Sequence, residues 1–170
     1  YILKARTTIL RDMGAAMSPF NAFMFIQGLE TLALRIKEHS KNADEIAKFL
    51  MSHPKVERVS HPSVASDLAK ERADKYLSGG CGGLMGFEIK GGIEAGKQFI
   101  NSLEMFYHVA NIGDSRSLAI HPASTTHSQL NEEELLSAGV TPGYVRLSIG
   151  LEHLDDIKDD LSQALDKVSV

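Results

Sequence analysis

The sequence of 170 residues contains no tryptophan and a single cysteine, Cys81. One cysteine cannot form an internal disulfide, and it cannot supply a zinc site built from several thiolates. The sequence also lacks an apolar run near the roughly 20 residues that span a bilayer. Charged residues interrupt the apolar stretches at its start, which is unlike a signal peptide. We therefore expect a soluble, cytoplasmic protein in a reducing compartment.

The sequence also lacks a large excess of positive or negative charge. The sequence has 18 lysines and arginines against 22 aspartates and glutamates, for a net charge of −4. Such a balance lacks the basic surface that binds nucleic acid or an anionic membrane, so neither partner is expected. What is present is a hydrophobic fraction of 43%. This is enough for one globular domain that buries roughly 70% of the surface of its unfolded chain.

Hydrophobic periodicity and capping residues predict alternating helices and strands. Ser18 and Pro19 suit the N-cap and the first position of a helix, and Gly28 divides the pattern that follows into residues 19–27 and 29–52. The fold class is α+β or α/β, most simply a small sheet with helices on one face and a long N-terminal helical strut. Further helices are predicted over residues 66–77, 92–103, 131–139 and 151–168, and strands over residues 56–62, 83–90 and 144–150.

The segment NIGDSRSLAIHPASTTH, residues 111–127, combines many small polar groups with His121 and His127. It suits a metal site, the nucleophile loop of a hydrolase, or the polar wall of a small-ligand site. The spacing of the two histidines fits no helix face and Asp114 is the only carboxylate nearby, which argues against zinc. A hydrolase is disfavoured because no G-x-S-x-G motif is present. The segment GGIEAGKQ, residues 91–98, ends in glutamine where a phosphate-binding loop needs a hydroxyl for magnesium, so we interpret it as a turn entering a helix.

Arg146 lies in the predicted strand YVRLSIG, where a charged residue is unusual. A guanidinium held on a rigid inner strand suits the bidentate binding of a carboxylate. An ion pair with one of the 22 acidic side chains is an equally good interpretation, and both stay open. Strand alternation places Val145, Leu147 and Ile149 on one face, and Tyr144, Arg146 and Ser148 on the other.

Three ordered motifs that extend over nearly the whole chain resemble one family. They are SPFNAFMFIQGLETLALRIKEHSKNADEIAKFLMSHPKVERVSHP (residues 18–62), NIGDSRSLAIHPASTTHSQL (residues 111–130) and GYVRLSIGLE (residues 143–152). Together they resemble the C-terminal domain of the pyridoxal-phosphate-dependent enzymes of cysteine and methionine metabolism, which have fold type I. The middle motif resembles the O-acetylhomoserine sulfhydrylase branch more than the lyases. The resemblance implies an α+β fold with a small, mostly antiparallel sheet covered by helices on one face.

The resemblance also implies roles for individual residues. In relatives the position of Arg146 binds the α-carboxylate of the amino-acid substrate. The segment at Asn111 and Ile112 lies beside it and gives a side-chain or backbone donor, and the position of Thr126 lines the same pocket. The two histidines of the segment are then interpreted as structural, and no catalytic or metal-binding residue is expected in this chain.

A longer enzyme is implied as well. The Schiff-base lysine of the family and the groups that hold pyridoxal phosphate lie in a larger N-terminal domain that nothing in this sequence matches. We therefore expect residues 1–52 to be an interdomain helical segment and residues 53–170 to be the C-terminal small domain, inactive alone. The full-length enzyme is expected to be a homotetrameric transferase of methionine biosynthesis, converting O-acetyl-L-homoserine and sulfide into L-homocysteine and acetate. A cystathionine or methionine γ-lyase, an O-succinylhomoserine-using relative and a non-catalytic oligomerisation module stay open as alternatives.

Overall fold

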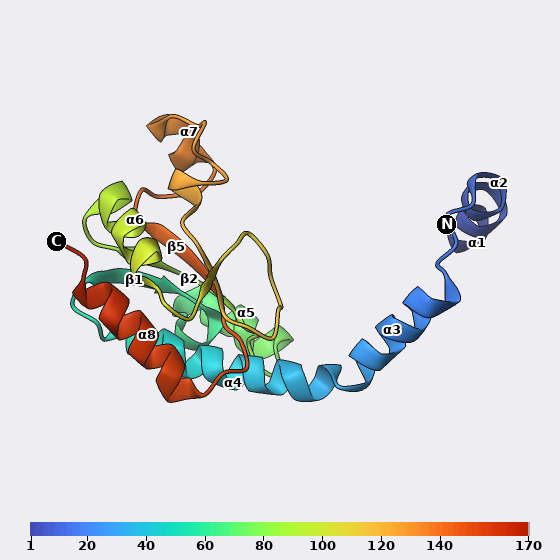
Figure 1. Cartoon of the computed structure of the whole chain (residues 1–170), viewed down its shortest axis with the longest axis horizontal. Helices are drawn as coiled ribbons and strands as arrows, with labels where there is room; N and C mark the ends of the chain where they lie inside the picture. The colour runs from blue at the N-terminus through green and yellow to red at the C-terminus, as the bar shows by residue number, and fades with distance from the viewer. Residues whose placement is uncertain (170) are drawn as a thin grey trace. The chain divides into compact units, whose positions relative to one another are not determined.

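The computed structural model describes residues 1–169, except for the side chain of Glu132. Contacts within the chain divide it into two units, residues 1–34 and the part from Arg35 onward, and each is described by itself. None of the residues 1–34 is buried. The sequence predicts that residues 1–52 connect the small domain to a larger N-terminal domain. That domain is not part of the 170 residues, so the interdomain role stays a prediction. The first unit contains α1 (Ile2–Lys4), the π-helical η1 (Ala5–Leu10), α2 (Arg11–Met13) and α3 (Pro19–Glu30) (Figure 1).

Helix α3 begins as the sequence predicts. Pro19 is its first residue, and the Ser18 hydroxyl accepts a hydrogen bond from the backbone N–H of Asn21 at 3.2 Å. The predicted break at Gly28 is wrong, because α3 continues to Glu30 and the interruption lies at Thr31, with φ −104° and ψ 4°. A glycine inside a helix costs only about 1 kcal/mol, which the surrounding turns can offset. Helix α4 (Leu32–Met51) follows.

The second unit is built on a five-stranded sheet in the order β1-β2-β5-β4-β3. Neighbouring strands are antiparallel except for β3 and β4, which run parallel. The predicted strand containing Arg146 is therefore the central strand of the sheet. The strands are β1 (Val56–Ser60), β2 (Leu84–Ile89), β3 (Tyr107–His108), β4 (Leu118–Ile120) and β5 (Tyr144–Ser148).

Three helices cover one face of this sheet and form the core with it. They are α4, α6 (Gly92–Ser102) and α8 (Leu154–Asp166), and each contributes buried apolar residues to a single cluster. Phe87 of β2 meets Phe99 of α6 edge-to-face, with ring centroids 5.4 Å apart. Such pairs add about 0.5–1.5 kcal/mol to the gain from burial. The predicted fold class, α+β with a mostly antiparallel sheet and helices on one face, is confirmed.

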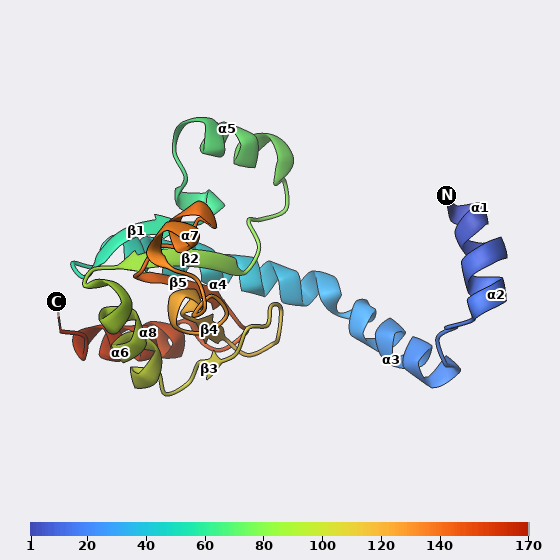
Figure 2. The same ribbon diagram turned by 90° about the horizontal axis from the view of Figure 1, so that it is seen from above.

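Helix α5 (Asp67–Tyr76) lies on the other side of β1 and β2 from α6 and α8, as Figure 2 shows. Ser66 occupies its N-cap position without capping it through the side chain, because the Ser66 hydroxyl donates to the Asp67 carboxylate instead. Helix α7 (Glu132–Ser137) is capped by the Asn131 side chain, which accepts from the backbone N–H of Glu134. Among the described residues, no helix is both long and apolar enough to cross a bilayer.

Candidate functional site

Strand β5 separates an apolar face from a polar face. Val145 and Leu147 are completely buried in the core under the helices. Arg146, opposite Gly86 of β2 and Ile120 of β4, lies on the face that these helices leave uncovered. The predicted alternation is therefore confirmed, and hydrogen-bonded strands hold the backbone of Arg146 on both sides.

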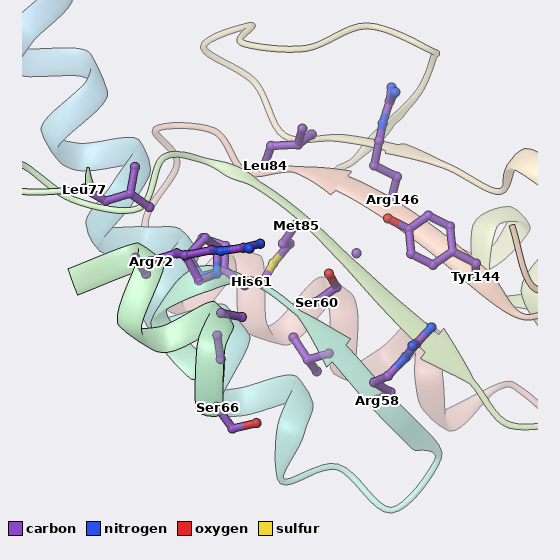
Figure 3. Close-up of a pocket in the computed structure, with 16 residues that line it drawn as sticks. Arg58, Ser60, His61, Ser66, Arg72, Leu77, Leu84, Met85, Tyr144 and Arg146 are labelled. Atoms are coloured by element: carbon purple, nitrogen blue, oxygen red, sulfur yellow. The ribbon is translucent and has the colours of Figure 1, made fainter. Parts of the chain in front are cut away.

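The Arg146 guanidinium extends from the sheet toward the loop that precedes β4 (Figure 3). Its Nη2 donates a hydrogen bond to the backbone carbonyl of Asn111 at 3.1 Å. Within residues 1–169, no described carboxylate forms an ion pair with it. The internal ion pair that the sequence left open is thus not observed, and most of the five guanidinium N–H groups stay available to a ligand.

Ser148 fixes the same loop from the same face of β5. Its buried hydroxyl accepts a hydrogen bond from the backbone N–H of Gly113 at 3.0 Å. The side chain of Asn111 accepts from the N–H of Ile112 at 3.0 Å, and Ile112 itself is exposed. The structure therefore brings Arg146, Asn111 and Ile112 together, and it adds Ser148 to them. Their role in binding a substrate stays a prediction.

The far end of the loop is anchored by the turn that follows β5. Glu152 accepts hydrogen bonds from the backbone N–H of Ser117 at 2.6 Å and from its hydroxyl at 2.9 Å. The Ser117 hydroxyl accepts from the N–H of Gly150 at 2.9 Å. Asn42 of α4 donates to the carbonyls of Gly150 and Glu152 at 3.2 and 3.1 Å. Bonds at both ends thus hold the loop beside Arg146, so little ordering is needed when a ligand binds.

Thr126 does not line the same cavity as Arg146. It lines a separate hollow of about 440 Å³ together with Thr125, Ile120 and residues 108–110. Its hydroxyl is within hydrogen-bond distance of His127 Nδ1, at 2.9 Å. The structure does not place Thr126 in the cavity that Arg146 lines. Its assignment to the substrate pocket stays a prediction.

His121 is completely buried, and both ring nitrogens have partners. Nδ1 lies 2.7 Å from the Ser124 hydroxyl and Nε2 lies 2.8 Å from the carbonyl of Pro142. Burial lowers the pKa of His121, and the hydrogen bond to Pro142 opposes this only in part. The ring packs against Gly96 so closely that any side chain there would collide with it. This contact explains why residue 96 of the GGIEAGKQ segment is glycine. The structural interpretation of His121 stays a prediction.

The polar face also carries a cavity of about 680 Å³ between α5 and the strands β1, β2 and β5. It is lined by Arg58, Arg72, Tyr144 and Arg146 among other residues. Sequence reasoning missed Arg58 and Arg72, because nothing local marks two arginines so far from residue 146 as its neighbours. No lysine lines this cavity or the hollow at Thr126. Among the described residues, no three histidine, cysteine, aspartate or glutamate side chains are grouped as metal ligands would be.

The sequence of this chain matches the model of an enzyme family. Residues 2–166 match the family described as Cys/Met metabolism PLP-dependent enzyme, and the chain belongs to that family. The cofactor of the family is pyridoxal phosphate.

Two relatives within this family are O-acetyl-L-homoserine sulfhydrylases. The chain is 56% identical to O-acetyl-L-homoserine sulfhydrylase of Leptospira meyeri over 169 residues, which are 99% of this chain and 38% of the relative. It is 48% identical to O-acetyl-L-homoserine sulfhydrylase 1 of Thermus thermophilus, over 97% of this chain and 39% of the relative. The chain therefore spans less than two fifths of the length of these relatives.

A solved structure agrees with the fold. The crystal structure of an O-acetylhomoserine (thiol)-lyase from Campylobacter jejuni superposes with a TM-score of 0.87 at 48% identity. The likeness covers 96% of this chain and 39% of that one. That protein carries N′-pyridoxyl-lysine-5′-monophosphate, the cofactor joined to a lysine.

Proposed function

We propose that this chain is the substrate-binding C-terminal part of a pyridoxal-phosphate-dependent O-acetylhomoserine sulfhydrylase. In this proposal the longer enzyme converts O-acetyl-L-homoserine and sulfide into L-homocysteine and acetate. The observation that supports it best is the Arg146 guanidinium, which lies on the central strand without a carboxylate partner among the described side chains and beside the loop at Asn111. A rigid planar guanidinium suits two parallel hydrogen bonds to an α-carboxylate.

The neighbouring loop completes the proposed substrate site. The bond from Arg146 to the carbonyl of Asn111 holds the guanidinium in one direction. The Asn111 side-chain oxygen already accepts from the N–H of Ile112, so in this proposal the amide N–H groups of Asn111 donate to the substrate. Arg146 and Asn111 would thus orient the substrate. Positioning of this kind can lower a barrier by about 7–11 kcal/mol in well-oriented reactions.

We also propose that this chain does not hold the cofactor by itself, and the absence of lysine from the lining of the two cavities described above supports this. In our proposal the N-terminal part of the longer enzyme binds pyridoxal phosphate and is the partner of this chain. The cofactor, when bound there, supplies an electron sink for removing substrate protons and releasing acetate. The chain described here contributes binding and orientation and has no activity alone.

Two spectroscopic outcomes distinguish this proposal from a self-sufficient enzyme. When pyridoxal phosphate is added to the 170-residue chain, we expect no stable absorption band of one cofactor per chain. The full-length enzyme is expected to show such a band. A stoichiometric and stable band with the 170-residue chain would contradict the assignment of the cofactor to another part of the enzyme.

Replacement of Arg146 tests the substrate role. In the full-length enzyme, Arg146→Ala should lower kcat/KM for O-acetyl-L-homoserine by the equivalent of about 2–5 kcal/mol, because the substrate carboxylate loses its partner in a desolvated site. Arg146→Lys should also impair the enzyme, since an ammonium group cannot donate in a planar fork. Lys48→Ala, on the outer side of α4, serves as the control. Near-normal kinetics of Arg146→Ala would exclude the substrate role.

Substrate profiling separates the remaining family activities. If the full-length enzyme cleaves cystathionine or methionine by elimination, the assignment changes to a γ-lyase. If it prefers O-succinyl-L-homoserine as the substrate, the assignment changes to a relative that uses that substrate. An oligomerisation module would show none of these activities, although it could still assemble. We propose a homotetramer for the active enzyme, and light scattering of the full-length protein measures this directly.

A further inference from the structure

The cavity between α5 and the sheet has two kinds of wall. Helix α5 and the segment before it present small apolar side chains, including Ala65, Ala69 and Ala73. Leu84 at the start of β2 adds an apolar side chain to the lining of the cavity (Figure 3). The volume of about 680 Å³ lies within the range of small-molecule sites, roughly 300–1,000 Å³. The apolar wall can therefore hold the hydrocarbon part of a small molecule.

The remaining wall is positively charged. Arg58 comes from β1, Arg72 from α5 and Arg146 from β5, so three elements each contribute an arginine to the lining of the cavity. No aspartate or glutamate lines it, and none of the described carboxylates forms an ion pair with these arginines. Concave surfaces with charge of one sign raise the local concentration of the opposite ion. The cavity thus favours an anionic ligand.

Tyr144 adds a hydrogen-bond donor between these charges. Its ring crosses from β5 over Gly86 of β2, where any side chain would collide with the ring. Figure 3 shows the hydroxyl oxygen turned toward the middle of the cavity. Within the described residues this hydroxyl has no hydrogen-bond partner. Burial raises the pKa of Tyr144, while the charges of Arg146 and Arg58 oppose the shift, so the hydroxyl is protonated near neutral pH and can donate.

We propose that this cavity is a second binding site, which takes a small organic carboxylate with an apolar body. The carboxylate would accept hydrogen bonds from the Tyr144 hydroxyl and from Arg58 or Arg72, while the apolar body lies against the alanines of α5. The Arg146 guanidinium is directed to the loop at Asn111 and contributes mainly its charge here. Inorganic phosphate fits less well, because it would leave the apolar wall in contact with water.

A matched pair of probes tests the proposal by calorimetry on the full-length protein that carries this chain. 4-Phenylbutyrate carries a carboxylate on an apolar body, and 4-phenylbutan-1-ol has the same body without the charge. We expect 4-phenylbutyrate to bind at one site per chain, and the alcohol and inorganic phosphate to bind at least about tenfold more weakly, since charged hydrogen bonds and apolar burial are both needed. Equal binding of acid and alcohol, tighter binding of phosphate, or no binding would overturn the proposal.

Variants then locate the site. Tyr144→Phe removes only the hydroxyl and should weaken 4-phenylbutyrate binding about three- to tenfold, and Arg72→Gln should weaken it about tenfold. Lys48→Gln, which removes an equal charge from the outer side of α4, should leave the dissociation constant unchanged. Thermal unfolding verifies that each variant is folded. Full affinity in both folded cavity variants, or an equal loss in Lys48→Gln, would overturn the assignment to this cavity.

Discussion

Ser148 and Arg146 lie two residues apart on one face of β5, and each holds part of the loop at residues 111–113. Strand alternation predicted that they share a face, but the partner of Ser148 could not be predicted. Gly113 is 35 residues away along the chain, and its N–H has no distinguishing sequence signature. For single residues, the sequence pattern predicted which face of the strand a side chain lies on. It did not predict the hydrogen-bond partner of that side chain.

Loss of the Ser148 hydroxyl should loosen the loop beside Arg146. Ser148→Ala leaves the N–H of Gly113 without its partner, which should cost about 1–3 kcal/mol of unfolding free energy. If the loop forms part of the substrate site, KM of the full-length enzyme for O-acetyl-L-homoserine should rise more than kcat falls, because the change affects binding. Steady-state kinetics measures this, with the exposed Ser128→Ala as the control. An unchanged KM would show that the loop takes no part in binding.

Buried histidines should make the stability of the fold depend on pH. Burial lowers the pKa of His121 and of His61. Below about pH 6.5 these rings become protonated in the unfolded chain, whereas in the folded protein they stay neutral down to a lower pH. The unfolded state therefore binds more protons in this range. The two neutral rings contribute fully to the free energy of unfolding above about pH 6.5. This contribution is lost as the pH falls through the lowered pKa values of the rings in the folded protein. Melting temperatures measured from about pH 7.5 down to about pH 5 should therefore decrease.

A variant separates the histidines from other acid effects. His121→Asn removes one titrating ring, so its melting temperature should decrease less steeply with acidification, although its overall stability is lower. An identical slope in this variant and the unchanged protein would exclude His121 as a source of the pH dependence.

At the scale of elements, long periodic segments were predicted better than short ones. The helices and strands of the core follow clear apolar patterns, and their positions agree with prediction. Strands β3 and β4 were not predicted, because segments of two and three residues are too short to show alternation. They exist because the sheet pairs them, as in the bond from the N–H of Tyr107 to the carbonyl of Ser117 at 3.0 Å.

Helix α8 is joined to the segment before β3 by one carboxylate. Asp160 is buried and accepts from the backbone N–H groups of Glu104, Met105 and Phe106, at 2.8, 3.0 and 3.2 Å. Asp160→Ala would leave these donors unpaired, so it should cost about 2–4 kcal/mol of unfolding free energy. Chemical denaturation measures the loss. The neighbouring Asp159→Ala changes an exposed aspartate of the same helix and should stay within about 0.5 kcal/mol; a similar loss in both would refute this role of Asp160.

At the scale of the whole molecule, the core belongs to one of the two units. Its buried residues run from Ala43 to Val168, whereas residues 1–34 contain none. The first unit instead exposes large apolar side chains, among them Phe20, Phe23 and Phe25. Exposed apolar side chains in such number favour a contact with other polypeptide, and we predict that this unit makes one.

Removing residues 1–34 should therefore leave the fold intact. The shortened chain, residues 35–170, is expected to unfold cooperatively with a melting temperature within a few degrees of the 170-residue chain, because no core residue is lost. It should also self-associate less, since the exposed apolar residues are gone. Calorimetry and sedimentation measure the two properties. Loss of a cooperative transition would show that the first unit supports the core.

The sequence by itself determined the helices from α3 to α8, the three long strands, the family and the face of β5 that carries Arg146. Each of these depends on residues close together in the chain or on motifs read in order. Only the tertiary structure decided that Arg58, Arg72 and Tyr144 line one cavity and that Thr126 does not line it. It also decided that the ring of His121 packs directly against Gly96. These contacts join residues that are distant in sequence, and no local periodicity records which distant side chains the folded sheet brings together.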